Sequence, residues 1–379
     1  MKLLKRLIPW ILLAFALFIL PTFLSDFRIN LFGRYFSLAI TALAIDLIWG
    51  YTGLLSLGQG IFFALGGYGV AMYLTLNTPS EAGGNGIPKF FENYGVGQLP
   101  FFWQPFWSPA FTLIAIWVLP AIVAGLVGYL IFRNRIKGVY FSIITQAALM
   151  VFFHFFNGQQ KLINGTNGLK TSTTELFGLQ VGSSDMQIWL YRLTVILIPV
   201  TFLICRYFTS GRFGDALIAI RDDEQRFRFA GFNPVPFKTI VFLVAGALCG
   251  ISGALYTVQS GIVSPQFMSI SFSIEMVIWV AVGGRGTLVG PIIGAVLVNY
   301  LRSLVSEALP EFWLFVQGAL FVFVVVLMPD GIYGWVSKGG LRSLLAAFGI
   351  APKARTYPQI DQEGPGMEMK SPAPTDSSA

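Results

Sequence analysis

The sequence predicts an all-α, polytopic integral membrane protein with about ten transmembrane helices (eight to ten), some of them broken or re-entrant. Hydrophobic residues make up 55% of the 379 residues and charged residues only 11%, whereas soluble domains carry about 25% charge. The mean hydropathy is +0.70. Because a charge at the centre of a membrane helix costs roughly 2.5–3.5 kcal/mol, long uncharged runs indicate membrane spans.

Apolar runs of spanning length predict the crossings in chain order, near 8–24, 34–50, 55–76, 109–132, 138–157, 189–207, 238–260, 270–284, 288–306 and 312–329. No small-residue cleavage site follows Phe23, so we expect the first run to be a retained helix rather than a signal peptide. The region 270–306 consists of two short apolar halves, each of which spans only if tilted or paired, and this keeps eight or nine crossings possible. Residues 354–379, rich in Pro, Ser, Gly and acids, predict a disordered cytoplasmic tail behind a membrane domain of residues 1–353.

The Lys/Arg bias predicts the orientation. Ten crossings place the basic N-terminus, the turn with Arg133 and Arg135, the segment 208–237 and the C-terminal tail on one side. Positive loops stay in the cytoplasm, so both termini are expected there. The two long loops on the other side, about 77–108 and 158–188, contain few lysines. The net charge of +7 is therefore interpreted as a topology signal, not as a sign of nucleic-acid binding.

Residues 208–237 form one polar, helix-patterned segment between the hydrophobic spans. Its apolar residues recur at spacings of three, four and seven, which predicts one apolar face: Phe213, Ala216, Leu217, Ile220, Phe227 and Ala230. Arg221 and Asp222 lie mostly off that face, and Gly231 followed by Pro234 ends the helix. Such a helix can dock into a groove on a soluble partner. A solvated connecting loop is the alternative.

Two glycine-rich stretches differ from ordinary spans. One is GLLSLGQGIFFALGGY (53–68), and the other is VGGRGTLVGPIIGA (282–295), which contains Gly283, Gly284, Gly286, Gly290 and Gly294. The last three repeat every four residues and form a small-residue face that lets backbones approach closely. Pro291 and the Gly–Gly pair before it predict a broken or re-entrant helix, as found at transporter substrate sites. Tight helix packing alone is the alternative.

Ionisable residues at membrane depth are few, chiefly Asp46, Glu275 and Arg285, and the cost of burying them makes each a candidate functional residue. Glu275 could face a cavity or belong to a network between helices. The sequence contains no phosphate-binding loop, no zinc motif and no Ser/His/Asp set, and its two cysteines lack metal-ligand spacing. It therefore predicts no catalytic residue, no metal site, no bound cofactor and no ATPase activity of its own.

Four motifs, in this order, resemble the permease subunits of branched-chain amino acid-type ABC importers. They are GYTGLLSLGQGIFFALGGY (50–68), GRFGDALIAIRDDEQRFRFAGFNP (211–234), FLVAGALCGISGALY (242–256) and SIEMVIWVAVGGRGTLVGPIIGA (273–295), and the resemblance covers about 30–330. Within that family DLIWGYTGLLSLGQG (46–60) resembles the second (C-type) permease of urea importers, as do the loops 86–107 and 157–170. Amino acid permeases more often have Asn where Asp46 stands and His or Tyr where Gln59 stands.

The resemblance implies a transport subunit in a bacterial inner membrane that carries urea or short amides. A branched-chain or polar amino acid permease is the alternative, and a secondary transporter or channel is a third class. The implied partners are membrane lipid, a sister permease, two cytoplasmic ATPase subunits that bind ATP and Mg, and a periplasmic substrate-binding protein. Segment 211–234 would be the coupling helix, with Ala216, Ile220 and Phe227 as its docking face and Gly231 at its end. The candidate substrate-path residues are Ser56, Gln59, Asp46 and Glu275.

Overall fold

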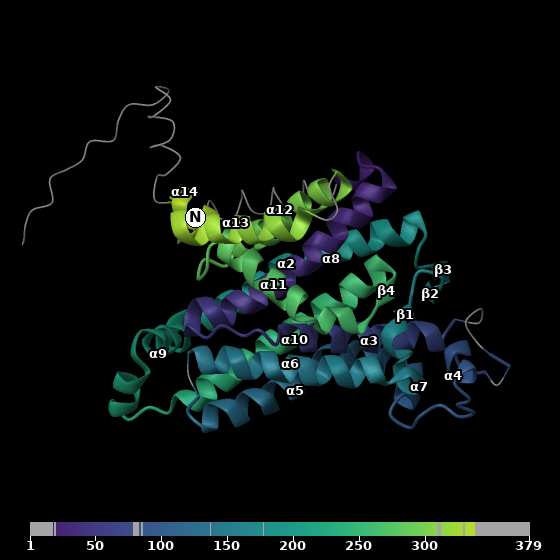
Figure 1. The fold of residues 1–379 in the computed structure, drawn as a ribbon, viewed down its shortest axis with the longest axis horizontal. Helices are drawn as coiled ribbons and strands as arrows, with labels where there is room; N and C mark the ends of the chain where they lie inside the picture. Colours follow the sequence, from purple (N-terminus) through teal and green to yellow (C-terminus); the bar gives the residue numbers. More distant parts are fainter. Residues whose placement is uncertain are drawn as a thin grey trace, which may run out of the picture. The chain divides into compact units, whose positions relative to one another are not determined.

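The computed structural model describes residue 18 and residues 20–78, 83–84, 86–136, 138–176, 178–308, 312–328 and 330–337. The described residues up to Trp335 belong to one compact unit built mainly of helices (Figure 1). A second unit begins at Val336, and only its first two residues are described. The expected first crossing at 8–24 lies outside the described residues except for Phe18 and residues 20–24, and the expected tail at 354–379 lies entirely outside them.

The long helices are α2 (Asp26–Thr52), α3 (Gln59–Leu76), α5 (Pro109–Arg133), α6 (Val139–Gly158), α8 (Ser184–Thr209), α9 (Gly211–Phe229), α10 (Pro234–Ser260), α11 (Ile270–Gly283), α12 (Val289–Ala308) and α13 (Trp313–Leu327). Short helices and 3-10 turns lie between and after them: η1 (Leu20–Thr22), α4 (Lys89–Asn93), η3 (Gln104–Trp107), α7 (Gln160–Ile163), η4 (Gly165–Asn167), η5 (Pro265–Met268) and α14 (Gly331–Ser337). The strands are two residues long each: β1 (Leu169–Lys170), β2 (Glu175–Leu176), β3 (Leu179–Gln180) and β4 (Ile262–Val263).

Seven of the described helices are long and apolar enough to cross a membrane, namely α2, α3, α5, α6, α8, α10 and α12. The helix α11 and residues Phe315–Val324 of α13 are shorter apolar helices. The predicted all-α membrane architecture is confirmed. The main difference in boundaries is at α2, which begins at Asp26 rather than near residue 34. The helix continues through Arg28 and Asn30, polar residues that limit a hydrophobic span but do not interrupt a helix.

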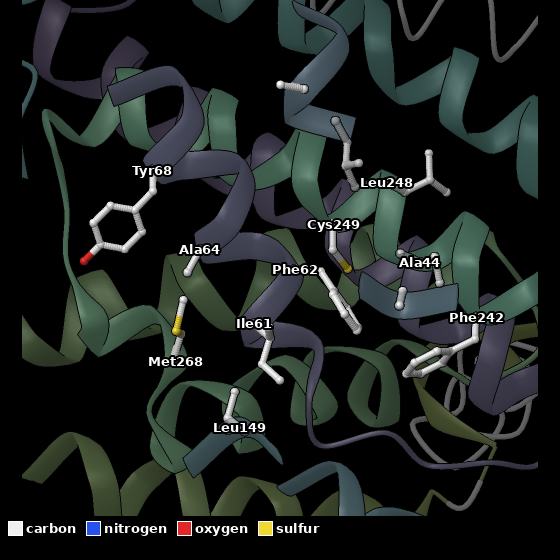
Figure 2. Packing of buried hydrophobic residues seen from close by; sticks show 14 of the residues in the cluster. Ala44, Ile61, Phe62, Ala64, Tyr68, Leu149, Phe242, Leu248, Cys249 and Met268 are labelled. Carbon is white, nitrogen blue, oxygen red and sulfur yellow. The ribbon is translucent and has the colours of Figure 1, made fainter. Parts of the chain in front are cut away.

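The centre of the bundle consists of α2, α3 and α10. In their spanning windows 83%, 83% and 61% of residues are buried, compared with 17% in α6. The helices α3 and α10 approach closely because a Cβ at Gly66 would collide with the backbone of Gly250. Figure 2 shows the Phe62 ring of α3 directed toward α10, where it packs edge-on against Phe242 at a centroid distance of 5.5 Å.

The two ends of the bundle differ. At one end the two long loops meet, because Trp103 Nε1 donates to the Leu162 carbonyl at 3.0 Å. The antiparallel pairing of β1 with β4 lies at the same end, and α9 lies at the other (Figure 1). The expectation that loops 77–108 and 158–188 share a side is therefore confirmed.

Candidate functional site

The first break in helical geometry is the segment Gly53–Gly58 between α2 and α3, in which Leu54, Ser56 and Gly58 are buried and Gly53 is exposed. Gly53 ends α2 in the left-handed region, with φ of 72°. Ser142 Oγ of α6 donates to the Leu55 carbonyl at 2.6 Å, and Leu57 N donates to Thr145 Oγ1 at 3.1 Å. Side chains of α6 therefore satisfy backbone groups that have no helical partner.

The second break is the turn at residues 284–288 between α11 and α12. Gly284 and Gly286 have φ of 118° and 74°, a region that favours glycine. A Cβ on Gly294 would collide with the Trp279 carbonyl, and Gly290 lies equally close to Gly283 and Gly284, so α12 crosses α11 on its small-residue face. The break predicted in the stretch 282–295 is present, but it lies at residues 284–288, and Pro291 lies within α12. The same stretch also forms the predicted packing face at Gly290 and Gly294. The break at Gly53–Gly58 shortens the crossing expected at 55–76, because α3 begins at Gln59.

Asp46 joins α2 to the second break. Its side chain is fully buried, and it accepts hydrogen bonds from Gly286 N at 2.5 Å and from Leu288 N at 3.0 Å. Both carboxylate oxygens are therefore occupied by backbone donors of the turn. This arrangement resembles an anchor for the turn more than a contact site for a solute.

The same region connects to α9. Arg221 Nη1 donates to the Gly50 carbonyl at 3.0 Å. Gly50 in turn lies so close to Gly286 that a Cβ on it would reach the Gly286 backbone. We refer to Asp46, Gly50, Arg221, Gly286 and Leu288 as the α2–α9 junction. This junction connects α9 to the turn at 284–288 through the C-terminal end of α2.

The helix α9 is divided by a kink at Asp223, where φ is −155° and ψ is 95°. The Asp223 carboxylate accepts from Gln225 N and Arg226 N at 3.0 Å each and caps the second part. Gly231 follows the helix with φ of 87°, and Asp222 pairs with Arg221 at 3.1 Å.

The predicted apolar face of α9 packs against its own chain. Leu217 and Ile220 are buried, Ala216 is half-buried, and the Phe227 ring packs against Phe237 with 5.8 Å between the ring centroids. The exposed aromatic residues lie elsewhere: Phe229 is 89% and Phe232 58% exposed. Ala230, the last residue of the predicted face, is exposed and follows the end of α9. Helical periodicity therefore identified the buried face only as far as Phe227, and it does not tell which surface buries that face.

Gln59 and Ser56 lie at the start of α3 and just before it, and both are buried. The Gln59 Oε1 accepts from the Cys249 thiol at 3.3 Å, while its Nε2 has no hydrogen-bond partner among the described residues. Ser56 Oγ accepts from Gly58 N at 3.3 Å.

Glu275 has a partner that the sequence analysis did not single out. Arg302 of α12 donates from Nη1 to Glu275 Oε1 at 2.5 Å. This ion pair supports the interpretation that Glu275 belongs to a network between helices. The hydrogen bonds of Asp46, Gln59 and Glu275 go to three separate groups of residues, so these hydrogen bonds do not join the candidates into one site.

A second ion-pair group also escaped the sequence analysis. Glu224 of α9 accepts from Arg228 at 2.7 Å and from Lys238 of α10 at 2.5 Å. The sequence did contain a sign of this ion pair, because Lys238 is a charged residue at the start of an otherwise apolar run. Over the described ranges, no three His, Cys, Asp or Glu side chains come close enough together to hold a metal ion.

Residues 27–325 match the family model described as branched-chain amino acid transport system / permease component. The chain is 26% identical over 315 residues to the high-affinity branched-chain amino acid transport system permease protein LivM of Escherichia coli strain K12, covering 77% of this chain and 67% of that protein. It is 22% identical over 329 residues to the probable LivM of Methanocaldococcus jannaschii, covering 79% of this chain and 90% of that protein. It is 20% identical over 230 residues to the ribose import permease protein RbsC of Haemophilus influenzae, covering 59% and 69%. No solved structure matches it.

Proposed function

The chain belongs to the family of permease components of branched-chain amino acid transport systems, and we propose that it carries branched-chain amino acids across the bacterial inner membrane. It does so as one membrane subunit of an ATP-driven importer. The observation that carries this proposal is the family match over residues 27–325, which includes both helix breaks and the whole of α9. The substrate named for LivM of Escherichia coli supports the choice of branched-chain amino acids.

The proposal includes the partners of such importers. Two cytoplasmic ATPase subunits bind ATP and Mg, a sister permease completes the membrane unit, and a periplasmic binding protein delivers the solute. The loops at the end of the bundle opposite α9 receive that protein. Both termini are cytoplasmic, on the side of α9.

The coupling step starts at the exposed tip of α9. Phe229 and Phe232 contact the ATPase, while Ala216, Ile220 and Phe227 hold the helix on its own bundle. When the ATPase displaces this tip, the hydrogen bond from Arg221 to the Gly50 carbonyl transmits the displacement to the end of α2. Asp46 transmits the displacement from α2 to the turn at 284–288, because its carboxylate accepts hydrogen bonds from two backbone N–H groups of that turn. The start of α12 then moves with α9.

Urea or a short amide is the second candidate substrate. The observation that favours it is the buried Gln59, whose Nε2 has no protein acceptor among the described residues and could donate to a neutral carbonyl. A path with Ser56 and Gln59 at the first helix break suits a neutral solute rich in donors and acceptors.

Competition uptake in cells that express the complete importer distinguishes the two substrates. If radiolabelled leucine enters and is displaced by valine and isoleucine but not by urea, the main proposal stands. If radiolabelled urea enters and is displaced by short amides but not by leucine, the second candidate replaces it. Uptake that persists when the ATPase subunits carry an inactive nucleotide site would contradict both proposals, because it would indicate a channel or a secondary transporter, which needs no ATP.

A further inference from the structure

A basic groove with a volume of about 890 Å³ opens beside the tip of α9. Its walls come from two connections that are distant in the sequence. The end of α5 and the turn after it contribute Tyr129, Arg133 and Arg135, and the passage from α9 to α10 contributes Arg228, Phe229 and Phe232. We call this the α5–α9 groove.

The charges of the groove are not balanced. Arg133 lies over the Tyr129 ring at 5.9 Å, and no described carboxylate is within ion-pair distance of Arg133 or Arg135. Arg228 does pair with Glu224, but that carboxylate is shared with Lys238. A groove with three guanidinium groups and one shared carboxylate behind them attracts an anion.

The groove adjoins an exposed apolar surface of α5. The helix α5 is a candidate span of which only 28% is buried, and Leu126 and Leu130 are exposed on it at a four-residue spacing. Tyr129 lies between these two leucines, and Arg133 follows Leu126 by about two turns, roughly 10 Å along the helix axis. Tyrosine and arginine at the end of an apolar stripe are typical of the level of lipid headgroups.

We propose that the α5–α9 groove binds the headgroup of an anionic phospholipid. The phosphate lies among Arg133, Arg135 and Arg228, and the acyl chains lie along Leu126 and Leu130. Basic pockets between spans on the cytoplasmic side bind such headgroups. A segment of a partner protein could bind here instead only if it placed acidic groups at the level of the lipid headgroups. The apolar stripe next to the arginines favours a phospholipid, because the acyl chains of a lipid can lie along it. The bound lipid joins the α5–α6 turn to the base of α10 beside the coupling tip, so it braces α9 from the side.

Lipid retention measured by native mass spectrometry tests this. The importer, purified with its partner subunits from nanodiscs of phosphatidylcholine with a graded fraction of phosphatidylglycerol, should retain phosphatidylglycerol preferentially. The double variant Arg133→Gln/Arg135→Gln should lower that retention roughly tenfold or more, because both unpaired charges are lost. Arg133→Lys/Arg135→Lys should restore much of it and also controls for folding. Arg212→Gln is the matched control, an exposed arginine at the start of α9 outside the groove, and should retain lipid as wild type does.

Four results would overturn the proposal. The first is wild-type retention by the double Gln variant. The second is an equal loss in the Arg212→Gln control, which would make the effect one of general surface charge. The third is displacement of the bound lipid by inorganic phosphate at equal phosphate concentration, which would assign a free-anion site. The fourth is loss of the ATPase subunits from the double variant with lipid retention unchanged, which would assign the groove to the partner.

Discussion

Replacing Asp46 by alanine should destabilise the protein and uncouple it, because the carboxylate satisfies two backbone donors of the turn at residues 284–288. Both acceptor contacts, to Gly286 N and Leu288 N, are in a fully buried environment where water cannot replace them. Asparagine keeps one carbonyl oxygen and turns its NH₂ group toward the other donor. We therefore expect the order wild type, Asp46→Asn, Asp46→Ala from most to least stable.

The size of the effect follows from the number of donors left without an acceptor. Each buried N–H that loses its partner costs about 1–3 kcal/mol, so alanine costs roughly 2–6 kcal/mol in total and asparagine about half of that. Removing a buried carboxylate offsets part of the cost, since that group was itself taken out of water. The net loss should lie toward the lower end of the range.

The assay pairs the thermal midpoint of the purified importer in detergent with solute uptake in proteoliposomes. Asp215→Ala removes an exposed carboxylate on α9 and should leave both readouts unchanged. If Asp46 contacts the solute instead, Asp46→Ala will change KM while its thermal midpoint equals that of the wild type. That combination would refute the anchoring role and return Asp46 to the substrate path.

Four further outcomes are expected. Arg221→Ala should leave ATP hydrolysis intact while uptake falls, since the hydrogen bond from α9 to the Gly50 carbonyl is lost; parallel ATPase and uptake assays check this, and equal loss of both would contradict it. Gly294→Val should lower the yield of folded protein, because its Cβ collides with the α11 backbone; a wild-type elution profile on size exclusion would count against the close crossing. In a cysteine-free background, Asp223→Cys should react with an impermeant thiol reagent only from the cytoplasm and Asn93→Cys only from outside, and labelling of both from one side would overturn the topology. Gln59→Leu should reduce urea uptake at least tenfold and leave assembly of the complex intact if the second candidate substrate is correct; unchanged urea uptake removes Gln59 from the path.

The sequence predicted those features that depend on neighbouring residues. Uncharged runs located the spans, and the Gly283–Gly284 pair located the break between α11 and α12. The contacts of Asp46 could not be predicted, because its two donors lie about 240 residues further along the chain. Likewise the pairing of Glu275 with Arg302 depends on how α11 crosses α12. The spacing of apolar residues predicted the apolar face of α9, but the residues that cover Ile220 depend on the tertiary packing.

The way α6 holds the Gly53–Gly58 segment has a consequence for how the bundle can move. Only 17% of the α6 window is buried within the chain, yet Ser142 and Thr145 of this helix hold the backbone beside the most buried helices. Those backbone groups have no helical partner, so we expect residues 55–57 to move with α6. We likewise expect the end of α2 to move with α9 through Arg221. Gly53 lies between these two segments, and we infer from its left-handed backbone that it is the hinge between them.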